Sequence, residues 1–345
     1  MNISKICGKR NRYKKIYQKR ERTGSEVAMF EHKDFAMNTE ITFKIFGENA
    51  PEACDDAMLG IRQLEKKLSR FIPDSEISRL NQAAGKRPVK ISPETRDLLS
   101  LAICYSKASK GSFNILTGAL MDLWDYKHAA DAPEKTKILQ ISPFIDYRDL
   151  ILDEHNQTAM LRKSGQSVDL GGIGKGFAAD FCMDIFKERG IASAFVNIGG
   201  NVSVLGNKPD GSPWCVGIRH PRRENELLAA VKVTGKTVVT SGDYERYFVD
   251  HEGKKWHHIM NPITGFPAES DLISVTIIAD NSTMADALST AVFVAGIDEG
   301  LMCLSKFPET DAILVDKHEQ VFITSELEKY FQCIENIKVN VIERK

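Results

Sequence analysis

Apolar residues recur at helical spacing in several long stretches of the chain. We expect helices over residues 50–71, 92–111, 175–189 and 284–296. Local start and stop signals support two of these helices and predict one more. Ser92 and Pro93 open the second helix, Gly190 closes the third, and Ser75 is expected to cap a further short helix.

Short apolar runs around these helices predict strands. The expected strands lie at 36–47, 166–170, 193–200, 214–219, 228–233, 237–241, 273–279, 312–316 and 321–325, the last two as a hairpin. Strands that are near each other in the sequence mix with long helices. This order predicts an α+β fold with a mixed, largely antiparallel sheet packed with helices, rather than a doubly wound parallel sheet.

Composition narrows the class of protein. The chain has 345 residues and a net charge of −1, which argues against a globally basic nucleic-acid binder but leaves room for a local anion site. Its seven cysteines are scattered and form no CxxC pair, so the sequence supports neither zinc nor thioredoxin-like chemistry. We expect free thiols and a reducing compartment.

The first 26 residues differ from the rest of the chain. Nine lysines and arginines fall between Lys5 and Arg22, and no apolar run of signal-peptide length accompanies them. We expect a basic, disordered tail over 1–26, solvated or touching an anionic surface, followed by one catalytic domain over 27–345. The sequence shows no apolar stretch approaching a membrane-spanning length of about 18 residues. These features predict a cytoplasmic protein, or a periplasmic or membrane-anchored one if the true N-terminus differs.

The stretch SVDLGGIGKGFAAD at 167–180 raises a chemical question. A predicted strand, four glycines with one lysine, and a helix form an arrangement that aims backbone N–H groups at an anion. The spacing matches neither the Walker A loop nor the GxGxxG dinucleotide fingerprint. Anion binding and simple close packing of backbone therefore both remain open for this loop.

Three other stretches carry polar groups that could act on such an anion. Asp286 and Thr290 are four residues apart on an otherwise apolar helix, and their oxygens suit Mg²⁺. Residues 240–243 (TSGD) follow a strand, and His257 and His258 precede a turn rich in proline and glycine. One histidine of this pair could act as a general base near a phosphate site.

These motifs together resemble one family. VDLGGIGKGFAAD, VNIGGNV, TSGDYERYF, HHIMNPITGFP and ADALSTAVFVAG occur in the order found in the ApbE family, the FAD:protein FMN transferases. AMNTEITF, LSRFIPDSEISRLN and GSFNILTGALMDLW resemble the family's N-terminal half, so the similarity spans about residues 36–325. The resemblance implies an ApbE-like, T-fold-like catalytic domain. It also implies Mg²⁺-dependent transfer of FMN from FAD to a threonine of an acceptor flavoprotein, such as a redox-complex subunit or an FMN-binding domain, with release of AMP.

The resemblance also assigns residues. It implies flavin or FAD contacts at Met37, Phe71, Ser112, Phe113, Asn114, Asp169, Lys175 and Met260. It implies metal ligands at Gly172 (carbonyl), Asp286 and Thr290, and a catalytic base at His258, which Asp243 would orient or replace.

Two alternatives and two departures accompany this assignment. The same site could hydrolyse FAD to FMN and AMP, as an FAD pyrophosphatase, if water attacked instead of threonine. A non-catalytic flavin carrier is disfavoured because both Asp286 and His258 are present. Asn114 and Asn261 stand where the family often has aspartate, which we expect to alter FAD contacts without removing phosphate chemistry.

Overall fold

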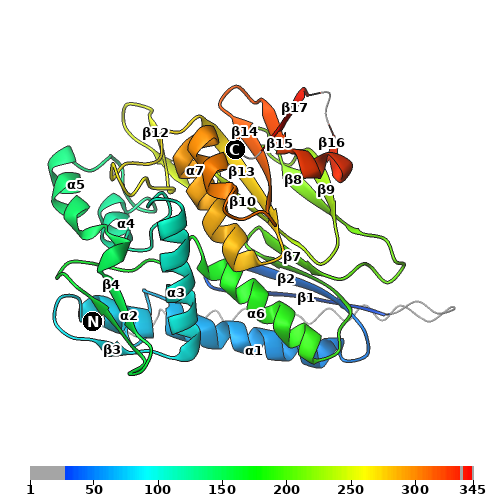
Figure 1. Ribbon diagram of the computed structural model, residues 1–345, viewed down its shortest axis with the longest axis horizontal. Coiled ribbons are helices and arrows are strands. Elements are labelled where there is room, and N and C mark those ends of the chain that lie inside the picture. Colours follow the sequence, from blue (N-terminus) through cyan, green and yellow to red (C-terminus); the bar gives the residue numbers. More distant parts are fainter. Residues whose placement is uncertain (1–27, 335–336, 344–345) are drawn as a thin grey trace, which may run out of the picture.

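The computed structural model describes residues 28–334 and 337–343, and the predicted basic tail over 1–26 lies outside them. A nine-stranded sheet has the order β1-β2-β6-β7-β10-β13-β14-β15-β17 (Figure 1). Every neighbouring pair in it is antiparallel except β15 and β17. The strands are β1 (Met29–Ala36), β2 (Thr39–Phe46), β6 (Ser193–Ile198), β7 (Asn201–Leu205), β10 (Thr237–Gly242), β13 (Leu272–Ala279), β14 (Asp311–Asp316), β15 (Val321–Thr324) and β17 (Val339–Ile342). The prediction of a mixed, largely antiparallel sheet is confirmed.

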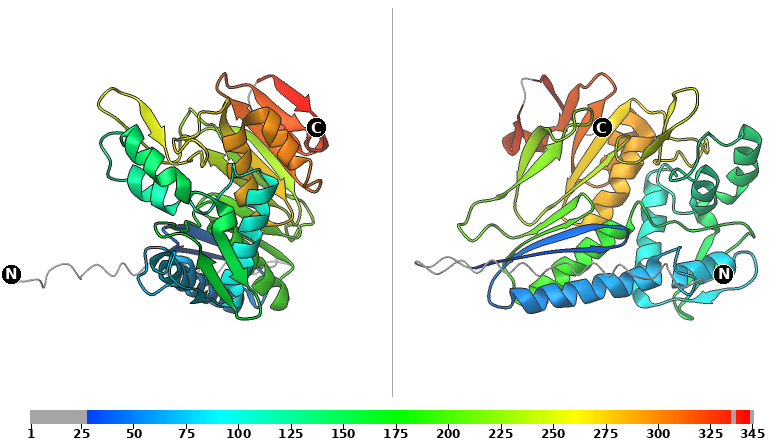
Figure 2. Two further views of the ribbon diagram at one scale, coloured as in Figure 1. Left: turned by 60° about the vertical axis from the view of Figure 1, so that its left-hand side comes forward. Right: turned by 180° about the vertical axis from the view of Figure 1, so that it is seen from behind.

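Three long helices cover one face of this sheet. They are α1 (Ala50–Leu68), α6 (Gly174–Glu188) and α7 (Ser282–Leu304), and Figures 1 and 2 show them stacked across the sheet. A small sheet of β8 (Trp214–Arg219), β9 (Leu227–Val233) and β16 (Phe331–Cys333) packs on the other face. Burial on both faces explains why central strands are continuously apolar. In β14, Ala312 and Leu314 pack among the helices, whereas Ile313 and Val315 pack toward the small sheet.

The remaining elements gather at one end of the molecule (Figure 1). They are α2 (Glu76–Gln82), α3 (Pro93–Ala108), α4 (Gly118–Trp124), α5 (Lys135–Ile141), β3 (Val89–Lys90), β4 (Leu150–Asp153), β5 (Thr158–Leu161) and the hairpin of β11 (Tyr247–Val249) and β12 (Lys255–His257). Short 3-10 turns lie at Ser142–Phe144, Tyr147–Asp149 and Ser325–Lys329. The capping predictions are confirmed, because the Ser75 hydroxyl accepts the Ser78 N–H and the Ser92 hydroxyl accepts the Thr95 N–H.

The prediction of a strand at 166–170 is wrong. This segment is extended, but its backbone bonds go to a side chain and a loop instead of a neighbouring strand. The Asn81 side-chain amide both accepts from the Val168 N–H (2.8 Å) and donates to the Val168 carbonyl (3.1 Å). The Asp169 N–H donates to the Ile115 carbonyl at 2.7 Å. A single side chain therefore replaces a strand partner, which an apolar pattern cannot reveal.

Strand β1 was not expected from the pattern. It is an edge strand whose residues are mostly exposed or half-buried, so it carries little apolar signal. Its turn into β2 places Met37 (φ 51°) and Asn38 (φ 58°) in the left-handed region, as in a type I′ hairpin. The Met37 N–H donates to Glu65 of α1 at 2.8 Å, which fixes this turn against the helix layer.

Helix α7 is the apolar centre of the helix layer. By length and composition it is the one helix in the described ranges that could cross a membrane, which the sequence pattern did not predict. Its buried side chains belong to the main core cluster, against β10, β13 and α6. Its regular geometry is interrupted at Gly296, where φ is +80°. The apolar composition of α7 is thus accounted for by its place in the core.

Candidate active site

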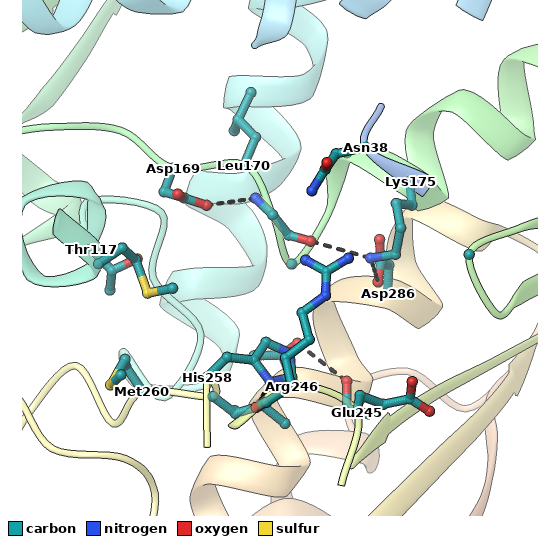
Figure 3. A pocket seen from close by; sticks show the side chains of 18 of the residues that line it. Asn38, Thr117, Asp169, Leu170, Lys175, Glu245, Arg246, His258, Met260 and Asp286 are labelled. Atoms are coloured by element: carbon teal, nitrogen blue, oxygen red, sulfur yellow. Dashed lines mark hydrogen bonds and ion pairs between the residues drawn. The ribbon is translucent and has the colours of Figure 1, made fainter. Parts of the chain in front are cut away.

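A pocket of about 820 Å³ opens where the end region meets the edge of the helix and sheet layers. Its walls come from the α1–α2 connection, the 112–117 loop, the glycine loop, the end of β10, the 258–262 turn and α7. Figure 3 shows side chains from the second, third, fifth and sixth of these segments around the pocket. All but one of the predicted site residues line it, namely Met37, Phe71, Ser112, Phe113, Asn114, Asp169, Gly172, Lys175, His258, Met260, Asp286 and Thr290. Segments far apart in the sequence therefore converge on one cavity.

The glycine loop is held in place by ionic contacts on its N-terminal side. Asp169 accepts the Gly171 N–H at 2.8 Å and pairs with the Arg70 guanidinium at 3.2 Å. The largely buried Arg70 also pairs with Asp122 at 2.6 Å and donates to the Gly118 carbonyl. The predicted FAD contact Asp169 thus also sets the shape of the loop.

The loop offers fewer free N–H groups than its sequence suggests. The Leu170 carbonyl accepts the backbone N–H groups of Ile173 and Gly174. The Asp169 carboxylate accepts the Gly171 N–H, and the Asp286 carboxylate accepts the Gly176 N–H. Within the described ranges, the N–H groups of Gly172, just before α6, and of Lys175, in its first turn, have no protein acceptor. Both residues line the pocket, so an anion could bind these two donors at the helix N-terminus.

The glycines of the loop serve two different purposes. A Cβ at Gly176 would lie 2.3 Å from the Ser282 carbonyl oxygen, so this glycine allows α6 to approach the start of α7. Gly171, Gly172 and Gly174 instead line the pocket. The close-packing and ligand-binding interpretations both hold, each for different positions.

Asp286 links the glycine loop to α7. Its carboxylate is buried, accepts the Gly176 N–H at 2.9 Å, and lies 3.5 Å from the Lys175 ammonium. Lys175 also donates to the Gly171 carbonyl at 3.2 Å. The charge of the lysine is therefore balanced by protein groups on this side of the pocket (Figure 3).

The predicted metal ligands lie around this carboxylate. Thr290 is one helical turn beyond Asp286, and a Cβ built on Gly172 would lie 3.4 Å from the Thr290 hydroxyl. Ser241 adds a hydroxyl 3.4 Å from that of Thr290. The described residues contain no group of three or more His, Cys, Asp or Glu side chains that could hold a metal. One carboxylate with neutral oxygens fits Mg²⁺ that takes further ligands from phosphate and water, and does not fit zinc.

The two adjacent histidines have different surroundings. His257 is half-buried, with Nε2 bonded to the Ala268 carbonyl (3.1 Å), Nδ1 accepting the Ile259 N–H (3.2 Å), and its ring edge-on to Phe293. His258 bonds through Nδ1 to the Arg246 carbonyl at 3.1 Å and lines the pocket. A carbonyl oxygen can only accept, so Nδ1 carries the proton and Nε2 has a lone pair. No side chain or backbone group in the part of the chain that the structure describes bonds to this Nε2.

The environment of His258 keeps it neutral. Burial, followed by the charge of the Arg246 guanidinium, lowers the pKa of His258 from its ordinary value of 6.5 to about 3. Burial also lowers the pKa of His257. At physiological pH the His258 imidazole is therefore neutral, which is the protonation state that a general base needs before the reaction.

The structure pairs Asp243 with Arg222 and not with His258, so the predicted role of Asp243 in orienting or replacing this base gains no support from the geometry. Asp243 does not line the pocket, and both of its carboxylate oxygens bond to Arg222, at 2.6 and 2.8 Å. The group that orients His258 is the Arg246 backbone carbonyl. Residue identity does not reveal a backbone partner, so sequence reasoning selected a carboxylate from the polar TSGD stretch after the strand instead.

The predicted flavin-contacting residues occupy different depths. Phe71 is 75% exposed at the pocket wall, with Arg70 and Lys127 over its ring, so it is not a core residue. Phe113 and Met260 are buried at the pocket walls.

The Asn114 side chain bonds to nearby backbone groups. It accepts the Leu116 N–H at 2.9 Å and donates to the Ile145 carbonyl at 3.5 Å. An aspartate at this position could make only the first of these bonds.

Asn261 acts as a turn residue. Its side-chain oxygen accepts the N–H groups of Ile263 and Thr264 at 2.9 and 3.3 Å. A carboxylate could accept the same two bonds, so the change from aspartate leaves this turn intact.

Several pocket residues were missed by sequence reasoning. They are Arg70, Tyr126, Ser241 as a partner of Thr290, and Arg246. Arg246 lies inside the TSGDYERYF stretch, where its positive charge next to a suspected phosphate site was an available signal. Arg70 and Tyr126 lie in or near family-like stretches but gave no chemical cue of their own.

The fold and the pocket define an α+β protein that sets a neutral imidazole in the same cavity as a carboxylate–lysine pair. A model of the ApbE family matches residues 37–314. A FAD:protein FMN transferase of Klebsiella pneumoniae is 31% identical over 87% of this chain and 93% of its own length. Another of that name from Treponema pallidum is 35% identical over 78% of each chain. The crystal structure of the ApbE protein from Thermotoga maritima has a TM-score of 0.81 at 30% identity, over 88% of this chain and 99% of that one. The chain belongs to the ApbE family.

Proposed function

We propose that this chain transfers FMN from FAD to a threonine hydroxyl of an acceptor flavoprotein and releases AMP. The observation that carries the proposal is the free Nε2 of His258, which lines the same pocket as Lys175 and Asp286. For a hydroxyl to attack a phosphate, the site needs a general base and groups that bind the phosphate oxygens. The names of the similar proteins from K. pneumoniae and T. pallidum support this activity.

The chemical step follows from these groups. His258 Nε2 accepts the proton of the threonine hydroxyl, and the threonine oxygen forms a bond to the phosphorus of the FMN half of FAD. The bond between that phosphorus and the bridging pyrophosphate oxygen breaks, and its electron pair leaves on AMP. The attacking and leaving oxygens lie roughly in line.

Protein donors hold the charge that this step develops. Lys175 and the N–H groups of Gly172 and Lys175 at the start of α6 would bind the pyrophosphate oxygens. Asp286, Thr290 and the Gly172 carbonyl would hold Mg²⁺ beside them. When bound, Mg²⁺ would offset the negative charge of the pyrophosphate.

The flavin would occupy the apolar part of the same pocket. Phe71 offers an exposed ring for stacking, and Met37, Phe113 and Met260 offer apolar walls. Ser112, Asn114 and Asp169 would contribute polar contacts to FAD. The acceptor is a folded flavoprotein domain that presents threonine at the pocket mouth.

The experiment mixes purified protein, FAD, Mg²⁺ and a threonine-containing FMN-binding acceptor domain, and follows acceptor mass and AMP together. We expect an acceptor heavier by one FMN, with equimolar AMP, and we expect EDTA to block both. An acceptor variant with the target threonine changed to alanine is the control and should stay unmodified. AMP with free FMN and an unmodified acceptor would instead identify an FAD pyrophosphatase. Absence of AMP under every condition would leave a flavin carrier.

A further inference from the structure

The cationic side chains that line the pocket differ in how they are neutralised. Arg70 pairs with Asp169 and Asp122, and Lys175 pairs with Asp286. Arg219 pairs with Glu245, and Lys127 lies 5.8 Å from the centre of the Phe71 ring at the pocket wall.

Arg246 is the exception among the pocket guanidinium groups. Within residues 28–334 and 337–343 it forms no salt bridge, and its side chain has a single hydrogen-bond partner, the Tyr126 hydroxyl at 3.5 Å. A hydroxyl at this distance does not neutralise a guanidinium. The pocket therefore presents one arginine whose charge and donors are available to a ligand.

Arg246 is coupled directly to the catalytic base. Its backbone carbonyl accepts two bonds from His258, one from the backbone N–H at 3.0 Å and one from Nδ1 at 3.1 Å. Figure 3 shows the two residues next to each other in the pocket. A base must lie within hydrogen-bond reach of the hydroxyl that attacks phosphorus, so the phosphate under attack lies close to Arg246.

We propose that Arg246 is a catalytic residue whose guanidinium binds the non-bridging oxygens of the FMN phosphate during transfer. This inference rests on the proposed function. A planar guanidinium can donate two parallel bonds to phosphate oxygens, which holds the phosphorus in line with the attacking hydroxyl. Lys175 and the start of α6 then serve the AMP side of the pyrophosphate. The FMN phosphate and the AMP phosphate of FAD would thus bind to different walls of the pocket.

The test compares ligands that differ only in phosphate. Calorimetric titration of wild type and Arg246→Gln with riboflavin, FMN and FAD separates ring binding from phosphate binding. We expect unchanged affinity for riboflavin and at least about tenfold weaker binding of FMN and FAD, as for loss of hydrogen bonds to a charged group. AMP release from FAD in the presence of acceptor should fall by about 10²- to 10³-fold.

Arg219→Gln is the matched control, because it removes a pocket guanidinium that Glu245 already pairs. We expect its FMN affinity and AMP release to stay within about threefold of wild type. Arg246→Lys keeps the charge but cannot donate two parallel bonds. We therefore expect a smaller fold-loss in FMN affinity than in the rate of AMP release. This variant also serves if Arg246→Gln fails to fold, as judged by circular dichroism.

Two results would overturn the assignment. Equal weakening of riboflavin and FMN would mean that Arg246 only shapes the pocket, and unchanged FMN binding with unchanged AMP release would mean that it touches no phosphate. The binding series does not depend on transfer. If the wild-type protein releases AMP without modifying the acceptor, the proposed transferase fails while the comparison of FMN with riboflavin still tests Arg246.

Discussion

The two walls of the pocket differ in how far their polar groups are already satisfied. On the glycine-loop wall, Lys175 and Asp286 contact each other, and Asp169 is held by Arg70. On the wall formed by residues 246–260, His258 keeps a bare Nε2 and Arg246 has no carboxylate partner among the described residues. The first wall is pre-organised by internal ion pairs, whereas the second presents groups that lack partners until a ligand arrives.

This difference separates two tasks of the site. Internal ion pairs fix geometry before substrate binds, so the pyrophosphate side needs little reorganisation. In the proposed mechanism, the attacking hydroxyl and the transferred phosphate would bind to His258 and Arg246 on the other wall. Substitutions on the two walls should therefore fail in different ways, and the following predictions are ordered from the largest expected effect to the smallest.

Asp286→Ala should have the largest effect. It removes the buried carboxylate that binds Lys175 and the Gly176 N–H, and with it the proposed metal ligand. We expect AMP release from FAD to fall by more than about 10³-fold with a retained fold. Mg²⁺ titration of AMP release and circular dichroism measure the two effects. Full Mg²⁺-dependent cleavage in this variant would refute the metal assignment.

His258→Ala should spare binding and remove transfer. We expect FAD affinity within a few-fold of wild type and a loss of about 10²-fold in acceptor flavinylation, measured by mass spectrometry. His257→Ala is the matched control, since both of its ring nitrogens bond to backbone groups. This variant should have a lower melting temperature and a transfer rate close to that of wild type. Equal transfer rates in the two variants would remove the base from position 258.

Gly176→Ala tests the packing behind the first wall. The added Cβ would lie 2.3 Å from the Ser282 carbonyl oxygen and 2.8 Å from the Asp286 Cβ. We expect the free energy of unfolding to fall by about 1–3 kcal/mol. Gly174→Ala is the control, because its Cβ would meet nothing closer than 3.7 Å. Urea denaturation of both variants measures the free energy of unfolding. Equal stability of the two variants would mean that α6 and α7 can move apart at no free-energy cost.

Asp243→Asn should have a small effect. Asp243 is paired with Arg222 outside the pocket, where the arginine is partly exposed. We expect a loss of about 1 kcal/mol or less in the free energy of unfolding and an unchanged transfer rate. A transfer rate lowered as strongly as in His258→Ala would restore Asp243 to the catalytic machinery.

The smallest effect should come from pH. With its pKa lowered to about 3, His258 stays neutral as the pH falls from 8 to 5, so the protonation state of the proposed base does not change over this range. A histidine with the ordinary pKa of 6.5 would lose activity about tenfold per pH unit below that value. We expect the transfer rate to vary less than about threefold between pH 5.5 and 8. A steep acid limb centred near 6.5 that disappears in His258→Gln would contradict the lowered pKa.

Much of the fold could be predicted from apolar periodicity and local signals. The helices at 50–71, 92–111 and 175–189 and the hairpin of β14 and β15 follow from side-chain spacing and caps, which are local properties. The edge strand β1 and the extended segment 166–170 escaped this reasoning. Their backbone bonds depend on exposure and on the distant Asn81 side chain, which spacing does not encode.

The sequence by itself determined which chemical groups this protein has. Residue types alone singled out Lys175, Asp286, Thr290 and one histidine of the pair His257–His258 as groups for phosphate chemistry. The ordered motifs indicated the family, and the resemblance chose His258. Tertiary structure decided how those groups are used. It paired Asp243 with Arg222, gave His258 a backbone carbonyl that fixes its tautomer, and, among the described residues, left the Arg246 guanidinium bonded to the Tyr126 hydroxyl with no carboxylate partner. The physical reason is that charge balance, burial and tautomer depend on neighbours that only the folded chain brings within hydrogen-bond distance.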